Sequence, residues 1–299
     1  MSYLYYPGCS LTGTAREYDL ATRAMMEALG VSLTELEDWT CCGPSAAEAC
    51  SELLSLALPA INLAIAETMD KTEDVLVPCS ACYLNLKKAN EVMRSDEKTR
   101  ARVNTVLAEK ELILEGSVAV RHLLDVLTTD IGAEAVQIQV KTDLSHLTIA
   151  PYYGCQCLRP YAVFDDPEEP RSMEPLIRAT GAHVHPWQMG AKCCGASHMN
   201  TKMPVALELV HAILQAAKGA DAIVTVCPMC QMNLEAYQDK INRRYGDVSS
   251  VTILYLPQLL GMALGLSDEA LGLGLNLAVN DHFRSKHKTA NFVRAEEIA

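Results

Sequence analysis

Ten of the twelve cysteines in this 299-residue chain form two sets of five that share one order and similar spacing. The first set is Cys9, Cys41, Cys42, Cys79 and Cys82, and the second set is Cys155, Cys193, Cys194, Cys227 and Cys230. In each set a single cysteine comes first, a Cys-Cys-Gly motif second and a Cys-x2-Cys motif third. The first gap is 31 residues in one set and 37 in the other, and the second gap is 36 and 32. Such repeated thiols are typical of metal binding or redox chemistry.

The number of thiols limits what each set can bind. A structural zinc ion takes four ligands, and a cubane iron–sulfur cluster takes four cysteines, so either leaves one cysteine per set unused. Two adjacent cysteines have diverging side chains, which chelate one metal poorly but reach two neighbouring irons. Five thiolates therefore favour a larger or opened iron–sulfur cluster, with zinc and a cubane as alternatives. A disulfide scaffold is disfavoured, because the chain is long, shows no signal peptide at its start and carries two vicinal cysteine pairs.

The two sets lie within a longer internal repeat. A Tyr-Tyr pair and a glycine precede the first cysteine of each set, and Asn85 and Asn233 each follow the last cysteine by three residues. A looser match pairs Val120-Arg-His122 with Leu256-Pro-Gln258. We interpret the chain as a duplicated unit.

Each half alternates short β-rich runs with longer helical patterns, which is typical of βαβ units. The prediction is an α/β fold of two pseudo-symmetric repeated domains, residues 1–140 and 141–299, each a small, mainly parallel sheet flanked by helices. The expected strands are 3–6, 33–38, 75–77, 147–153, 183–187, 222–226 and 252–256. The expected helices are 14–29, 45–69, 80–95, 117–130, 170–180, 197–218, 229–244 and 257–265.

The predicted strands also place the cysteines. The first cysteine of each set and the first of each Cys-x2-Cys pair directly follow an expected strand, and the vicinal pairs follow the next strands. Ligands of open parallel sheets bind outside the carboxyl ends of the strands, so each half should gather its five cysteines at one sheet edge. Gly43 and Gly195 would allow tight turns there. Cys79 and Cys227 are expected at helix N-termini, where the helix dipole favours thiolate.

The ten cysteines and their glycines resemble the CCG-domain family of cysteine-rich iron–sulfur proteins, which includes the catalytic B subunit of heterodisulfide reductase. The resemblance covers essentially the whole chain. It implies that each five-cysteine set holds one noncubane [4Fe–4S] cluster. It also implies an anaerobic enzyme that reduces a heterodisulfide of two coenzyme thiols, of the CoM-S-S-CoB type, with each of two facing clusters supplying one electron.

The same resemblance implies partners. An iron–sulfur C subunit would supply electrons, and a flavin-containing A subunit would complete a heterodisulfide reductase-like complex. The alternative is an electron-transfer subunit of a larger oxidoreductase complex, which passes electrons to a flavin, a quinone or another enzyme. The chain shows no P-loop and no G-x-G-x-x-G motif of its own.

Polar residues near the cysteines are candidates for binding substrate. Lys192, His198 and Arg159 are placed to bind an anionic coenzyme thiol or to protonate a leaving thiolate; the alternative is three ordinary surface residues. Asn85 and Asn233 are expected either to hydrogen-bond cluster sulfurs or to pack in helices.

Two cysteines lie outside the repeated pattern. Cys50 is expected to be a buried free cysteine on a helix. Cys157 has no counterpart in the first half. It is expected to be a bystander that points away from the second site if its segment is extended, and the alternative is a position near the second cluster.

Composition excludes several classes of protein. Hydrophobic residues make up 49% and charged residues 21%, which is typical of a globular protein, and the net charge of −12 argues against nucleic acid and anionic membranes as partners. The longest apolar stretch, 53–66, contains Pro59 and Asn62 and is too short to span a bilayer. We therefore expect a cytoplasmic protein without direct membrane insertion, with attachment to a membrane through another subunit as the alternative.

Overall fold

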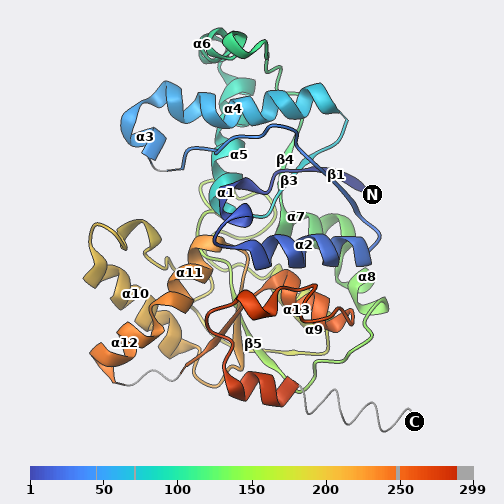
Figure 1. Cartoon of the computed structure of the whole chain (residues 1–299), viewed down its shortest axis with the longest axis vertical. Coiled ribbons are helices and arrows are strands. Elements are labelled where there is room, and N and C mark those ends of the chain that lie inside the picture. Colours follow the sequence, from blue (N-terminus) through green and yellow to red (C-terminus); the bar gives the residue numbers. More distant parts are fainter. Residues whose placement is uncertain (45, 71, 247–249, 288–299) are drawn as a thin grey trace.

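The computed structural model describes residues 1–44, 46–70, 72–246 and 250–287. In this part of the chain two four-stranded parallel sheets lie one beyond the other along the long axis (Figure 1). The strands are β1 (Ser2–Tyr5), β2 (Ser32–Glu35), β3 (Val75–Val77), β4 (Val120–His122), β5 (Thr148–Tyr152), β6 (His183–Val184), β7 (Ala222–Thr225) and β8 (Thr252–Tyr255).

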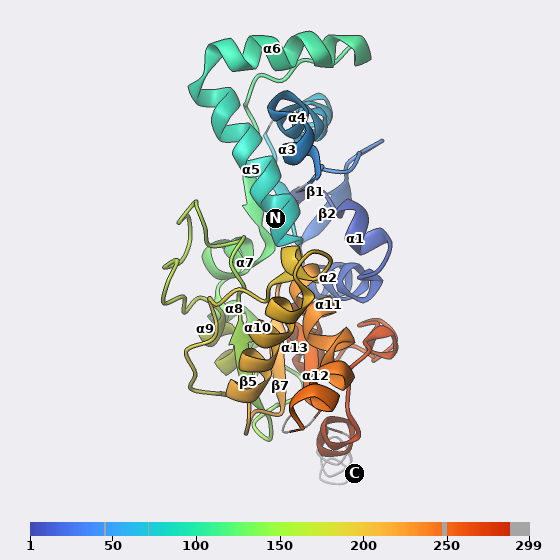
Figure 2. The same ribbon diagram turned by 90° about the vertical axis from the view of Figure 1, so that its left-hand side faces the viewer.

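Helices connect the strands and cover both sheets (Figure 2). The helices of the first half are α1 (Gly8–Thr12), α2 (Arg16–Ala28), α3 (Ala46–Cys50), α4 (Glu52–Met69), α5 (Ser80–Ser95), α6 (Glu97–Leu107), α7 (Leu123–Val126) and α8 (Ala133–Ile138). Those of the second half are α9 (Met173–Ala179), α10 (Met203–Ala216), α11 (Pro228–Ala236), α12 (Gln238–Tyr245) and α13 (Leu256–Ala263). Shorter turns are the 3-10 helices Ala108–Lys110, Ala196–His198 and Leu273–Leu275 and the π-helix Leu127–Ile131.

Both sheets have the same topology. The strand order is β2-β1-β3-β4 in the first and β6-β5-β7-β8 in the second, and every described pairing is parallel. The strands β3 and β7 are buried throughout, because helices cover both faces of a parallel sheet and its strands are continuously apolar. The predicted α/β class with two pseudo-symmetric sheets is confirmed.

The strand β4 corrects the prediction of a continuous helix over 117–130. Its three residues, Val120, Arg121 and His122, pair with β3 before α7 begins. A segment this short, with one apolar residue in three, shows no strand periodicity. The counterpart β8 was predicted, so the repeat itself was the available signal for β4.

Strand pairing also corrects the weaker part of the repeat. Val77 pairs with His122, and Thr225 pairs with Tyr255. Because Val77 and Thr225 each lie two residues before a Cys-x2-Cys motif, the counterpart of His122 is Tyr255, not Gln258.

Three predicted helices are divided. The helix expected over 45–69 breaks at Ser51, whose hydroxyl accepts a hydrogen bond from the Leu54 amide and caps α4. The helix expected over 197–218 becomes a 3-10 turn followed by α10, and the one over 229–244 becomes α11 and α12. Three further helices, α1, α6 and α8, were not predicted.

Among the described residues, α4 alone has the length and apolar composition to cross a membrane. The helix is longer than the apolar stretch 53–66 that the sequence analysis judged too short for this. Half of it is buried inside the protein. Its Asn62 accepts a hydrogen bond from the Thr40 amide, and its Glu67 accepts from the amides of Glu115 and Ser117. These buried polar contacts are typical of a core helix, since a bilayer would leave both side chains unpaired.

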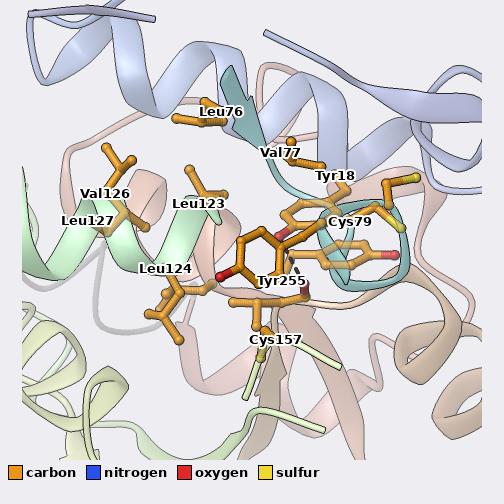
Figure 3. Close-up of a cluster of buried hydrophobic side chains, with 14 of the residues drawn as sticks. Tyr18, Leu76, Val77, Cys79, Leu123, Leu124, Val126, Leu127, Cys157 and Tyr255 are labelled. Carbon is orange, nitrogen blue, oxygen red and sulfur yellow. Dashed lines mark hydrogen bonds between the residues drawn. The ribbon is translucent and has the colours of Figure 1, made fainter. Parts of the chain in front are cut away.

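The two sheets meet through a continuous hydrophobic core that includes residues of both halves. Helix α2 packs against α13, and the rings of Tyr18 and Tyr255 stack with centroids 4.0 Å apart (Figure 3). The Tyr18 hydroxyl donates to the carbonyl oxygens of Pro78, at 3.0 Å, and Val226, at 3.2 Å. Pro78 follows β3 and Val226 follows β7, so the carboxyl ends of the two central strands converge on one buried hydroxyl.

Candidate iron–sulfur sites

The first five-cysteine set forms one group of neighbouring thiols. The Sγ atoms of Cys9 and Cys41 lie 4.0 Å apart, and those of Cys42 and Cys82 lie 3.4 Å apart. The Cys79 thiol also interacts with Cys82. Cys9 and Cys41 are exposed, whereas the other three are buried. The three buried cysteines therefore form the floor of the site, and the two exposed cysteines form a rim that is open to solvent.

The second set repeats this arrangement. The Cys155 and Cys193 thiols interact, the Sγ atoms of Cys194 and Cys230 lie 3.6 Å apart, and Cys227 interacts with Cys230. Cys193 is exposed and Cys155 is half-buried, whereas the other three are buried. The structure thus brings each set together at one sheet edge.

Sheet topology explains why these thiols converge. The order of strands reverses between β1 and β3 and between β5 and β7, which is the point where open α/β sheets bind ligands. Cys9 follows β1 and Cys79 follows β3 as the N-cap of α5. In the second half Cys155 follows β5, and Cys227 follows β7 as the N-cap of α11. Each vicinal pair arrives from the neighbouring strand, β2 or β6.

The residue before the first cysteine of each set must be glycine, because a sulfur atom of the same site lies directly beside its backbone. Gly8 and Gly154 have φ angles of +69° and +72°. A Cβ atom at Gly8 would lie 2.8 Å from Cys82 Sγ, and one at Gly154 would lie 2.9 Å from Cys230 Sγ. Any side chain would therefore occupy the space of a site sulfur.

Amide groups point at the sulfurs in both sites. The backbone N–H of Gly43 donates to Cys41 Sγ at 3.4 Å, and that of Gly195 donates to Cys193 Sγ at 3.3 Å. Such donors favour the thiolate form that binds metal.

The two repeated asparagines act alike. Asn85 Nδ2 lies 3.3 Å from the Cys42 carbonyl oxygen and 3.6 Å from its Sγ. Asn233 Nδ2 lies 3.3 Å and 3.8 Å from the same atoms of Cys194. Each amide therefore fixes the second cysteine of a vicinal pair.

Two tyrosines in the sites were missed by sequence reasoning. Tyr6 donates to the Thr40 carbonyl oxygen at 2.7 Å, and Tyr152 donates to that of Lys192 at 2.6 Å. Thr40 and Lys192 immediately precede the vicinal cysteines. Burial, together with the surrounding thiols, keeps the pKa of both tyrosines far above its usual value, so they remain donors. Their signal was a tyrosine three residues before the first cysteine of each set.

The polar candidates are placed differently from one another. His198 is exposed and Arg159 is half-buried, and both lie near Cys193. The pKa of Cys193 is lowered to about 5, mainly by hydrogen bonding with Cys155 and further by the charges of His198 and Arg159. Lys192 is exposed and lines a surface hollow beside this site.

Arg159 is held in place by two hydrogen bonds. Its guanidinium donates to the Ala191 carbonyl oxygen at 2.7 Å and to Glu168 at 2.8 Å. The bond to Ala191 fixes it against the segment that carries the vicinal pair.

Both remaining cysteines differ from expectation. Cys50 is exposed rather than buried, because α3 ends at the surface. Cys157 is buried, but the segment around it is a turn rather than extended, since the Leu158 and Arg159 amides both donate to the Cys155 carbonyl oxygen. The Cys157 thiol therefore lies near Cys227 instead of pointing away from the second site.

The five cysteine sulfurs of each site are suited to bind a cofactor that is larger than a single metal ion. Within the described ranges no three His, Cys, Asp or Glu side chains are arranged to hold a single metal ion. Each site instead offers five sulfurs, of which three are buried, with a glycine where a side chain would intrude. These features fit an iron–sulfur cluster.

Two sulfur-lined sites on paired parallel sheets define an iron–sulfur electron-transfer protein. The family model of the CCG cysteine-rich domain matches residues 3–87 and 149–235. The chain belongs to this CCG family, as its motifs indicated.

Named relatives cover nearly the whole chain. The 8-methylmenaquinol:fumarate reductase membrane anchor subunit of Wolinella succinogenes is 35% identical over 92% of this chain and 96% of its own length. The B subunit of the ferredoxin:CoB-CoM heterodisulfide reductase of Methanosarcina mazei is 29% identical over 93% and 94%. A protein of Archaeoglobus profundus that is named as similar to the heterodisulfide reductase B subunit is 28% identical over 90% and 92%. The resemblance to heterodisulfide reductase B subunits is confirmed, and the chain is an oxidoreductase protein.

One solved structure shares the fold. A hypothetical protein from Helicobacter pylori aligns with 93% of this chain at a TM-score of 0.74 and 17% identity. The aligned part is 52% of that protein, so this chain spans about half of it.

Proposed function

We propose that the chain is the catalytic subunit of a disulfide reductase that acts on a heterodisulfide of two coenzyme thiols, of the CoM-S-S-CoB type. The reaction is R–S–S–R′ + 2 e⁻ + 2 H⁺ → RSH + R′SH, with electrons supplied by a partner subunit. The observation that carries the proposal is the convergence of the two sites, because the buried Tyr18 hydroxyl bridges the residues before Cys79 and Cys227. Two one-electron centres at facing strand ends match a two-electron substrate.

The ten motif cysteines would hold two noncubane [4Fe–4S] clusters, one in each set. When bound, these groups supply electrons one at a time. Exposed Cys9 and Cys41 in the first site, and Cys193 in the second, form the open rims at which substrate would approach.

The chain's own polar residues would act at the second rim. Arg159, fixed against Ala191 and ion-paired with Glu168, would contribute a guanidinium to the binding of an anionic coenzyme beside Cys193. His198, which is exposed near the same thiol, would protonate a leaving thiolate. Lys192 lines the neighbouring hollow together with Glu168, Glu169, Arg171 and Glu174, and would add its ammonium group at the edge of this rim.

A second function is favoured by one comparison. The relative from Wolinella succinogenes is 35% identical to this chain, compared with 29% for the B subunit from Methanosarcina mazei. It is named as the membrane anchor subunit of an 8-methylmenaquinol:fumarate reductase. An electron-transfer subunit would use the same two sites to pass electrons to a flavin, a quinone or another enzyme. In either function we propose a multi-subunit assembly, with an iron–sulfur C subunit and a flavin-containing A subunit for the reductase.

Anaerobic purification with its partners, followed by iron and sulfide analysis, tests the proposal. Two four-iron clusters give about eight irons per chain, and adding a thiol to the oxidised protein should produce a new paramagnetic signal. Cys41→Ser and Cys193→Ser should each lose about half of the iron, whereas the control Cys50→Ser should lose none. Iron without a thiol-induced signal would favour the electron-transfer function. Zinc without sulfide would refute both.

A further inference from the structure

The second half carries a loop that the first half replaces with helices. After Cys9 the chain forms α1 and α2, whereas after Cys155 it runs as an irregular loop to the start of α9. This loop contains Arg159, whose matching position, four residues after the first cysteine of the set, is Gly13 in the first half. The guanidinium of the loop therefore belongs to the second site and has no equivalent at Gly13.

Carboxylates within the loop hold its backbone in one shape. Asp166 accepts hydrogen bonds from the amides of Glu168 and Glu169, both at 2.8 Å. Asp165 accepts from the amide of Ser172 at 2.8 Å, which ties the end of the loop to its middle. The backbone that carries Glu168 is therefore fixed by hydrogen bonds within the loop.

The side chain of Glu168 forms an ion pair with Arg159. Its Oε1 accepts from Arg159 Nη1 at 2.8 Å, while Arg159 Nη2 donates to the Ala191 carbonyl oxygen at 2.7 Å. The side chain of Glu168 is 68% exposed, whereas that of Arg159 is 35% exposed. Because an exposed ion pair contributes little stability, the Glu168 carboxylate can turn into water at small cost. An incoming anion can therefore break this pair.

Both partners of Arg159 line the hollow beside the second site. The hollow has a volume of about 390 Å³, and its walls include Glu168, Ala191 and Lys192. Arg159 is not among the described residues that form these walls. Its guanidinium therefore lies behind Glu168 and Ala191, and an anion that enters beside Lys192 reaches it by replacing the Glu168 carboxylate.

The other two glutamates of the hollow have different partners. Glu174 is half-buried and accepts a hydrogen bond from the Tyr153 hydroxyl. Glu169 is exposed and lies 3.8 Å from Arg171. Loss of the Glu169 charge would therefore change the charge of the hollow in general, whereas loss of the Glu168 charge would free a guanidinium.

We propose that Glu168 is a specificity-determining residue, whose carboxylate occupies the place of the substrate's anion on Arg159 until substrate displaces it. The inference rests on the proposed function, because it concerns the anionic thiol or disulfide that binds beside Cys193. A ligand whose anion reaches Arg159 has to displace Glu168, and a neutral ligand does not. Glu168 therefore lowers the affinity for anionic ligands and leaves the affinity for neutral ones unchanged.

Calorimetric titration of the anaerobic complex tests this with two thiols, the anionic 2-mercaptoethanesulfonate and the neutral 2-mercaptoethanol. Glu168→Gln should tighten binding of the anionic thiol by up to about fivefold, the range of an exposed ion pair, and leave the neutral thiol unchanged. Glu169→Gln removes the same charge from the hollow but not from Arg159, and should have a smaller effect. In an Arg159→Gln background, Glu168→Gln should lose its effect, because both changes act on one contact.

The sign of the change distinguishes competition from support. If Glu168→Gln weakens binding of the anionic thiol, the carboxylate positions Arg159 for substrate and the proposal is wrong. An effect no larger than that of Glu169→Gln, equal effects on both thiols, the same gain without Arg159 or no binding by any variant would also overturn it. The heat of binding does not depend on the thiol-induced paramagnetic signal. A protein that binds the thiol without that signal would count against disulfide reduction alone, so the two failures are separable.

Discussion

Replacing Glu235 with glutamine should stabilise the protein at alkaline pH and have little effect in acid. Glu235 lies on α11, is 7% exposed, and has its pKa raised from 4.5 to about 7, mainly by burial. Its Oε1 accepts from the Ala278 amide at 3.3 Å and from Asn276 Nδ2 at 3.4 Å, and the nearby Glu17 adds negative charge. Glutamine keeps an oxygen acceptor and removes the ionisable group.

The magnitude follows from proton linkage. Because the folded pKa lies above the unfolded one, the native state binds more protons, and stability is lost as pH rises from about 4.5 to about 7. A difference of about 2.5 pKa units corresponds to about 3 kcal/mol above that window. Glu235→Gln should therefore raise the free energy of unfolding by up to about 3 kcal/mol at pH 8 and by little at pH 4.

Urea unfolding under anaerobic conditions at both pH values measures this difference. Glu48→Gln is the matched control, because Glu48 is exposed and its pKa is lowered by hydrogen bonding to Lys88. That control should show a small loss of stability at pH 8. An equal effect of Glu235→Gln at pH 4 and pH 8 would refute the assignment of a buried, proton-binding carboxyl.

Two predictions concern the sites. Gly8→Ala or Gly154→Ala should each remove about half of the bound iron, because the new Cβ would lie within 3 Å of a site sulfur; Gly30→Ala, at a positive φ with no atom nearby, controls for backbone strain, and full iron content in the site variants would contradict the reasoning. Arg159→Gln and His198→Gln should raise KM for an anionic disulfide several-fold without loss of iron, measured by steady-state kinetics, and an unchanged KM would exclude them from substrate binding.

Much of the fold was predictable from local pattern. The strands β3 and β7 are continuous apolar runs next to a cysteine, and the repeated motifs required two equivalent sheets. Because the cysteines directly follow strands, parallel topology alone gathers them at one edge. The strand β4 was missed because its three residues, of which only Val120 is apolar, show no strand periodicity.

Within the sites, the ligands were predictable but their supports were less so. Asn85 and Asn233 were identified because each follows the last cysteine of its set by three residues. In the structure this spacing brings each side-chain amide to the second cysteine of the vicinal pair. Tyr6 and Tyr152 were present in the repeat, but their bonds to Thr40 and Lys192 depend on how neighbouring strands lie.

The sequence by itself determined the duplication, the α/β class and the two sets of sulfur ligands, because each depends on spacing along one stretch of chain. Only the tertiary structure decided how the two halves meet. The stacking of Tyr18 on Tyr255 and the reach of Ser80 to Val226 join residues far apart in sequence. Such contacts depend on the packing of α2 against α13, which no local periodicity encodes.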